Sequence, residues 1–262
     1  MNIPADIVGR EIGPDEQQVD KRWLMAYSAG LGETVYPHPL FPVCYEWPAT
    51  RWLRERAGLV PIDARLVHAQ HDLTIHRPPV AETLFISGKV VAAVQRTPGT
   101  LVVYRFVTRD EEQNPVSTTD FSALYRGATL EGGDRSIAEV EDPPKHSQAL
   151  NPIGDIAVAA TAAHVYTECA RIWNPIHTDV EYARSAGLPD IILHGTATLA
   201  LSISAASKKL ALKTVKRVRC RFAGMVTMPG TLTVHASRIG DEVAFETRDA
   251  RGEKVIERGW IG

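Results

Sequence analysis

The chain has 262 residues, of which 44% are hydrophobic and 23% are charged, and its formal net charge is −2. This composition is ordinary for a globular protein with a substantial buried core, and the length suits one large domain or two of average size. The near-neutral charge excludes a basic field that would recruit nucleic acid or an anionic membrane surface.

The N-terminal segment and the cysteines indicate the compartment. Residues 1–16 lack a basic patch followed by an apolar stretch, and the weakly polar run at 195–206 is too short to span a bilayer. The three cysteines, Cys44, Cys169 and Cys220, are odd in number and show no CxxC spacing. This argues against a disulfide framework or a zinc site and fits a reducing compartment. We therefore expect a cytoplasmic protein with no nucleic-acid partner and no membrane association.

The first half of the chain predicts helices followed by strands. Helices are predicted at 15–32 and 49–59. Residues 72–127 then read as strand, proline-rich link, two strands, a Thr-Arg-Asp turn at 108–110 and a further strand. The polar segment at 131–154, which contains glycines and prolines, is predicted to be a linker.

The second half gives a clearer pattern. Leu199, Ile203 and Leu210 form an apolar stripe at near-helical spacing, which predicts a helix over 195–210 packed on a sheet. Apolar and polar residues then alternate with turns between them, which predicts four strands, at 214–224, 229–239, 242–249 and 254–262.

The two halves share a pattern that indicates an internal duplication. The Thr-Arg-Asp turn of 108–110 recurs at 247–249, and the Thr-Leu strand opening of 83–84 recurs at 231–232, in the same order. We infer two repeats, 1–130 and 155–262, joined by the linker at 131–154. Each repeat combines a helix with an antiparallel sheet, which is an α+β layout.

Two short runs in the second repeat are candidates for chemistry. Asn174 precedes Pro175 and is predicted to cap a helical turn that includes His177, where the helix dipole would keep the imidazole neutral. Gly195 directly precedes an apolar helix, so its backbone N–H is a candidate donor to a developing oxyanion. Taken singly, each run also fits a purely structural turn.

Together these runs resemble a known motif. Residues 166–201 are similar to the type 2 (R-specific) enoyl-CoA hydratase motif of the MaoC-like family, because residues 174–177 (Asn-Pro-Ile-His), Ala183 and residues 193–195 (Leu-His-Gly) all match it. The resemblance implies a double hotdog fold, in which two hotdog repeats each have a helix wrapped by an antiparallel β-sheet, with a degenerate N-terminal repeat. It also implies a homodimer, expected from the exposed sheet edges.

The same resemblance implies a reaction and roles for residues. The reaction is reversible hydration of a trans-2-enoyl-CoA to an (R)-3-hydroxyacyl-CoA, or the corresponding dehydration, in fatty acid metabolism. His177 would be the base and acid, Asn174 the positioner of water, and Gly195 the oxyanion donor. His194, Arg171 and Trp173 are candidate substrate-binding residues, with packing or solvent exposure as the alternatives. The substrate would be an acyl-CoA or acyl-carrier thioester, and no metal or cofactor is implied.

One departure from the motif leaves the mechanism open. The family's Gly-Asp pair is Arg171-Ile172 here, and an isoleucine cannot transfer a proton. Another acid, Glu168, Asp179 or Glu181, could substitute, His177 could act alone, or the site could only bind thioesters. The rival functions are accordingly a non-catalytic acyl-CoA-binding protein and a thioesterase.

Three further histidines cluster in the first repeat, at positions 68, 71 and 76. On a regular strand His68 and His71 would point to opposite faces and would not share a metal. We interpret all three as structural residues or as residues that line a pocket.

Overall fold

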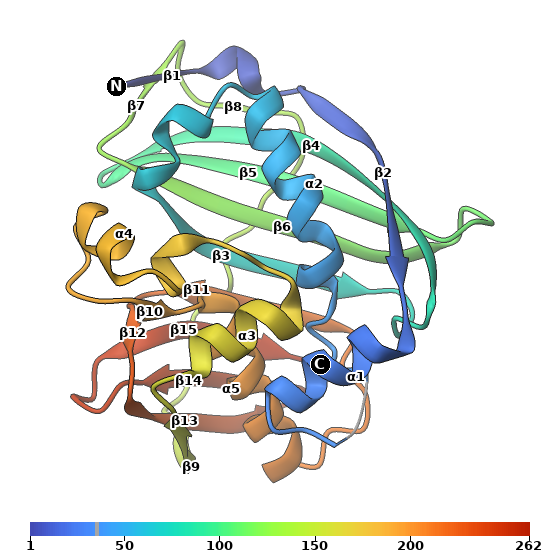
Figure 1. The fold of residues 1–262 in the computed structure, drawn as a ribbon, viewed down its shortest axis with the longest axis vertical. Helices are drawn as coiled ribbons and strands as arrows, with labels where there is room; N and C mark the ends of the chain where they lie inside the picture. The colour runs from blue at the N-terminus through green and yellow to red at the C-terminus, as the bar shows by residue number, and fades with distance from the viewer. Residues whose placement is uncertain (35–36) are drawn as a thin grey trace. The chain divides into compact units, whose positions relative to one another are not determined.

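The computed structural model describes residues 1–34 and 37–262 (Figure 1). These residues divide by their internal contacts into two compact units. Unit 1 is Met1–Val19 with Tyr45–Asp142, and unit 2 is Asp20–Cys44 with Pro143–Gly262. Within the described residues, no helix has both the length and the apolar character needed to cross a membrane.

Unit 1 is an antiparallel sheet with a helix on one face (Figure 1). The strand order is β2-β4-β5-β6-β3, and the short β8 pairs with β4. Helix α2 (Pro42–Arg56) lies against β6, where Glu46 accepts hydrogen bonds from the hydroxyl groups of Thr119 and Ser117. The other elements are β1 (Asn2–Pro4), η1 (Ala5–Ile7), β2 (Glu11–Val19), η2 (Val60–Arg65), β3 (Leu66–Ile75), β4 (Glu82–Arg96), β5 (Gly99–Arg109), β6 (Pro115–Arg126), β7 (Thr129–Glu131) and β8 (Arg135–Ser136).

Unit 2 repeats this topology. Its strand order is β9-β13-β14-β15-β11, and helix α5 (Gly195–Lys209) packs on β9, β13, β14 and β15. The strands are β9 (Asn151–Val158), β11 (Arg217–Phe222), β13 (Gly230–Ile239), β14 (Glu242–Arg248) and β15 (Lys254–Ile261). The remaining elements are α1 (Lys21–Gly30), α3 (Ala162–Ala170), η3 (Pro175–His177), α4 (Val180–Ser185), β10 (Ile192–Leu193) and β12 (Val226–Thr227).

The recurring Thr-Arg-Asp turn has the same hydrogen bonds in both units. In unit 1 the Asp110 N–H donates to the Asn114 carbonyl at 3.1 Å, and Asp110 Oδ1 accepts from the Asn114 N–H at 2.8 Å. In unit 2 Asp249 and Glu253 make the same two bonds, each at 2.9 Å. The equivalent turns and strand orders support the inferred duplication.

The helix predicted at 15–32 is wrong at 15–19. Those residues belong to β2, which pairs with β4. Helix α1 begins after Asp20, whose carboxylate accepts a hydrogen bond from the Trp23 N–H at 2.7 Å and so caps the helix. The predicted helix at 49–59 lies largely within α2, which begins earlier, at Pro42.

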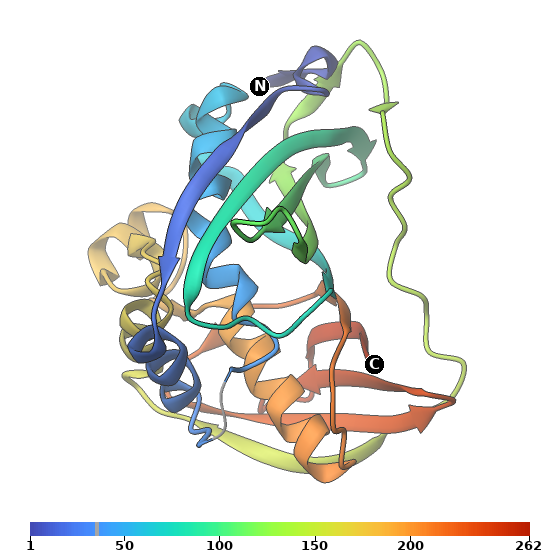
Figure 2. The same cartoon turned by 90° about the vertical axis from the view of Figure 1, so that its right-hand side faces the viewer.

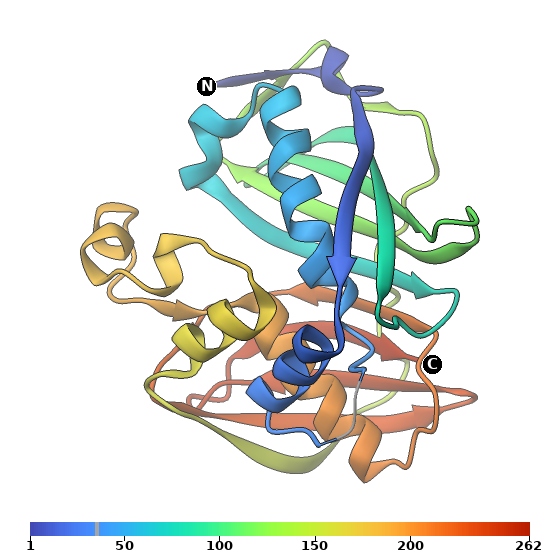
Figure 3. The same ribbon diagram turned by 45° about the vertical axis from the view of Figure 1, so that its right-hand side comes forward.

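The two units also differ from the predicted consecutive domains 1–130 and 155–262. Asp20–Cys44 groups with unit 2, because α1 packs beside α3 (Figure 3). The hydroxyl oxygens of Tyr27 and Tyr166 lie 3.3 Å apart at this contact. The predicted linker, 131–154, contains β8 and the first residues of β9.

Unit 1 contains two irregular strands. Strand β4 is strongly curved (Figure 2), and its pairing with β5 shifts register between Val90 and Ala92. Strand β3 shifts its pairing with β6 between His68 and Gln70. The His68 and His71 rings consequently meet edge to face with centroids 5.4 Å apart, so the prediction that they point to opposite faces is wrong. In the described part of the chain, no three potential ligand side chains gather as a metal site would require.

Candidate active site

The loop after helix α3 holds the Asn-Pro-Ile-His run. Arg171 caps α3 in the left-handed conformation, with φ 57° and ψ 32°. Ile172 is buried, and its N–H donates to the Thr167 carbonyl. The Asn174 side chain accepts a hydrogen bond from the Ile176 N–H at 3.4 Å and caps η3. The predicted cap and helical turn are therefore confirmed.

His177 lies at the end of η3 and is only 9% exposed. Its Nδ1 atom is 2.8 Å from the carbonyl oxygen of Ile192 in β10. Because a carbonyl can only accept, the proton sits on Nδ1 and the lone pair on Nε2. Burial lowers the pKa of His177 to about 4, and the hydrogen bond to Ile192 opposes this shift. The imidazole is neutral as predicted, but burial is the main cause.

His194 and Gly195 form the start of helix α5. His194 is the N-cap and Gly195 is the first helical residue, so the Gly195 N–H has no acceptor within the helix. A Cβ atom at Gly195 would lie 3.2 Å from the Phe222 ring, which is tighter than ordinary contact. The absence of a side chain therefore keeps this turn close to Phe222 while leaving a backbone donor at the helix start.

The rings of His177 and His194 lie face to face. Their centroids are 3.6 Å apart and their planes differ by 23°. His194 Nε2 lies 3.3 Å from the Thr167 hydroxyl. Burial and the nearby His177 hold the pKa of His194 well below its usual value, with the Ile172 carbonyl opposing them. The structure thus brings together His177, His194 and the helix start at Gly195.

The other two candidate substrate-binding residues lie in different surroundings. The Arg171 guanidinium is 3.7 Å from the Asp20 carboxylate and 4.2 Å from the centre of the Trp23 ring, both contributed by the α1 region. Trp173 is 59% exposed. Arg171 is therefore already engaged within unit 2, and a substrate contact by Arg171 or Trp173 stays a prediction.

The three acids that could replace the motif aspartate are all more accessible to solvent than the buried His177. They are Glu168, Asp179 and Glu181. The Asp179 carboxylate accepts a hydrogen bond from the Tyr182 N–H at 2.9 Å and caps α4. A solvated carboxylate on a helix or cap is a poor substitute for a buried one beside the imidazole.

Sequence reasoning missed several residues around the two histidines. Tyr166 packs on His194 with ring centroids 4.9 Å apart, and Thr167 contacts its Nε2 atom. Both residues lie on α3, and Tyr166 is the first residue of the matched stretch 166–201, which was the available signal. The contribution of Ile192 is a main-chain carbonyl, which no residue type reveals.

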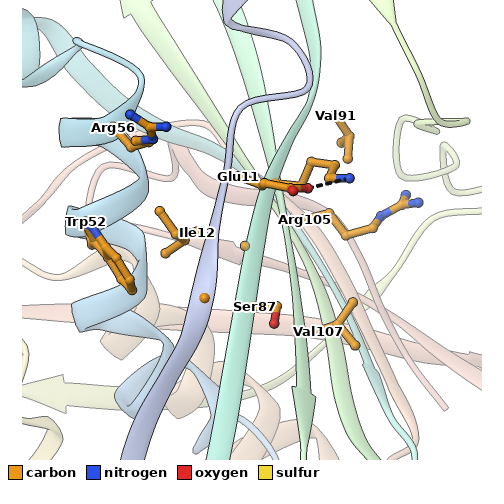
Figure 4. A pocket seen from close by; sticks show the side chains of 11 residues that line it. Glu11, Ile12, Trp52, Arg56, Ser87, Val91, Arg105 and Val107 are labelled. Carbon is orange, nitrogen blue, oxygen red and sulfur yellow. Dashed lines mark ion pairs between the residues drawn. The ribbon is translucent and has the colours of Figure 1, made fainter.

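A separate groove of about 610 Å³ lies in unit 1 (Figure 4). Trp52 and Arg56 of α2 line one side, and Arg105 of β5 lies on the other. Glu11 and Lys89 form an ion pair at 2.7 Å across the paired strands β2 and β4. The lining contains none of the predicted site residues, so the candidate site is assigned from the chemistry of unit 2.

Residues 143–258 match the family model of the MaoC like domain. This part of the chain is a MaoC-like domain. It contains all of the predicted site residues.

Peroxisomal multifunctional enzyme type 2 of Drosophila melanogaster is 28% identical over 190 residues, which cover 70% of this chain and 31% of that protein. Peroxisomal enoyl-CoA hydratase 2 of Arabidopsis thaliana is 24% identical over 213 residues, which cover 75% of this chain and 67% of that protein. The chain thus spans less than a third of the length of the Drosophila relative.

Solved structures extend the likeness beyond the MaoC-like domain. A MaoC-like dehydratase from Phytophthora capsici superposes with a TM-score of 0.85 at 20% identity, covering 98% of this chain and 96% of that one. A Mycobacterium tuberculosis protein with a double hotdog fold superposes with a TM-score of 0.63 at 15% identity, covering 97% of this chain and 94% of that one. The predicted double hotdog fold is confirmed.

Proposed function

We propose that the protein is a hydro-lyase that reversibly adds water to a trans-2-enoyl thioester of coenzyme A and gives the (R)-3-hydroxyacyl thioester. The observation that carries this proposal is the state of His177, a neutral imidazole whose proton is held on Nδ1 by Ile192. The names of the relatives, which include enoyl-CoA hydratase 2, support the same reaction class.

The chemistry assigns one task to each group. Nε2 of His177 takes a proton from water while the water oxygen bonds to C3 of the substrate. The electrons of the C2–C3 double bond move toward the thioester carbonyl, whose oxygen accepts a hydrogen bond from the Gly195 N–H. The imidazolium then protonates C2 and the carbonyl re-forms. A positioned base typically contributes about 100- to 10,000-fold, and one oxyanion donor about 3 kcal/mol.

His177 serves both proton transfers in this proposal. Ile172 occupies the position of the family's aspartate, and the nearby acids Glu168, Asp179 and Glu181 are not buried beside the imidazole. Asn174, which caps η3, keeps its amide NH₂ group as a donor that would help to orient the water.

Product analysis tests the proposal. The protein is incubated with trans-2-enoyl-CoAs of several chain lengths, and the products are separated on a chiral column, for the native chain and for His177→Asn. The proposal expects (R)-3-hydroxyacyl-CoA from the native chain only. Release of CoA without hydration would indicate a thioesterase. Binding of the thioester without any product would indicate a non-catalytic acyl-CoA-binding protein.

The other expectations stand as proposals beside this one. They are a cytoplasmic location, a homodimer, and a reaction that needs no metal or cofactor. Light scattering of the purified protein checks the dimer.

A further inference from the structure

The proposed reaction raises a question about charge. His177 becomes an imidazolium during each turnover, yet Ile172, only 5% exposed, stands where the family has a carboxylate. Forming a cation in a buried place is costly unless a neighbouring group stabilises it. The Ile192 carbonyl stabilises the cation at Nδ1, and a second group contacts the face of the ring.

The group in contact is the ring of His194. It is 3% exposed and lies face to face with His177 at 3.6 Å between centroids. Its Nε2 atom is directed to the Thr167 hydroxyl at 3.3 Å. His194 thus meets His177 through its π face rather than through a nitrogen atom.

We propose that His194 is a positioning residue for His177, whose ring face fixes the plane of the catalytic imidazole and stabilises the imidazolium. The inference rests on the proposed function of His177. A neutral aromatic face attracts a cation that lies within about 6 Å of the ring centre. The geometry explains how His177 can work without an adjacent carboxylate, and it gives His194 a role other than the predicted substrate contact.

Two substitutions separate the ring face from the ring nitrogens. His194→Phe keeps an aromatic face and removes both nitrogens, whereas His194→Leu removes the face. We expect His194→Phe to keep kcat within about threefold of the native value and His194→Leu to lower kcat about 3- to 30-fold. KM should change less than about twofold in both variants, because His194 acts through His177. Thr167→Val removes only the hydroxyl group that contacts His194 Nε2, so it is the matched control for loss of that contact.

A readout without turnover distinguishes failure of the inference from failure of the proposed reaction. The pKa of His177 is followed by NMR in protein labelled with ¹⁵N-histidine, and its signal is assigned from the spectrum of His177→Asn. We expect the pKa of His177 to fall by about half a unit to one unit in His194→Leu and to stay near the native value in His194→Phe. If the native protein hydrates no enoyl thioester but this difference appears, the proposed function fails and the interaction stands.

Three results would overturn the inference. They are equal losses in His194→Phe and His194→Leu, a rise in KM with kcat unchanged, or an unchanged pKa of His177 in His194→Leu. If His194→Leu shows no cooperative thermal transition, His194→Gln replaces it, because glutamine is polar and has no aromatic face.

Discussion

The Nδ1 atom of His177 lies 2.8 Å from the carbonyl oxygen of Ile192, so a main-chain atom selects the tautomer of the proposed base. Ile192 belongs to β10, whose backbone pairs with Thr227 of β12. The orientation of the imidazole therefore depends on backbone pairing within unit 2. Side-chain substitutions around the site should change the basicity of His177 more readily than its tautomer.

Replacing His177 with asparagine should remove activity without unfolding the protein. The asparagine amide can still donate toward the Ile192 carbonyl, but it has no basic nitrogen. We expect kcat to fall at least about 100-fold. His164→Asn, at an exposed histidine of α3, is the control and should keep native activity. Steady-state kinetics and thermal melting measure both effects, and native turnover by His177→Asn would exclude His177 as the base.

Restoring the motif carboxylate with Ile172→Asp should raise the pKa of His177 above about 4, because a nearby negative charge favours the imidazolium. A stronger base should increase kcat. The free energy of unfolding should fall by at least about 1–3 kcal/mol, because a polar group replaces a buried apolar one. Ile172→Asn carries a similar stability cost without the charge. Equal kinetics for the two variants would show that the carboxylate adds nothing here.

Arg171 offers a test of backbone strain. It has φ 57°, a left-handed conformation that glycine adopts without penalty. Arg171→Gly and Arg171→Ala both lose the contacts with Asp20 and Trp23. The difference in stability between the two variants therefore measures the free-energy cost of the left-handed backbone conformation. We expect the glycine variant to be more stable than the alanine variant by about 1 kcal/mol in urea unfolding. Equal stabilities would mean that the loop relaxes. A KM raised equally in both variants would instead support the predicted substrate contact.

Glu46 makes the stability of the fold depend on pH. Burial raises the pKa of this carboxyl group to about 8, although hydrogen bonds from Thr119 and Ser117 oppose the shift. The folded state retains a proton that the unfolded chain releases near the ordinary glutamate pKa of 4.5, so stability falls as pH rises from there to about 8. The slope approaches about 1.4 kcal/mol per pH unit. Glu46→Gln should lose this slope between pH 7 and 8 in urea unfolding, and parallel curves for the two proteins would contradict the assignment.

The sequence predicted helix α5 and the four strands β11, β13, β14 and β15 of unit 2, because their signals are local. Alternation along the strands, the turn between the strands predicted at 229–239 and 242–249, and the apolar stripe of 195–210 all correspond to observed elements. The motif likewise located the Asn174 cap and brought His177 and Gly195 into one unit.

The failures arose where distant contacts decide the structure. Residues 15–19 look helical by composition but pair with β4 across a long sequence separation. The register shift after His68 and the packing of α1 on α3 also depend on partners far along the chain. The stacking of His177 on His194 joins a loop to a helix cap, and sequence spacing does not encode ring geometry.

The most direct test of a single-base hydratase is the pH dependence of kcat/KM between about pH 4 and 8. The loss of enoyl-thioester absorbance measures the rate at each pH. Neutral His177 is the proposed active form, and its pKa is about 4. We predict a plateau from about pH 5.5 to 8 and a fall on the acid side through one ionisation. A second fall on the basic side within this range would reveal a separate catalytic acid. No turnover at any pH would contradict the proposed reaction itself.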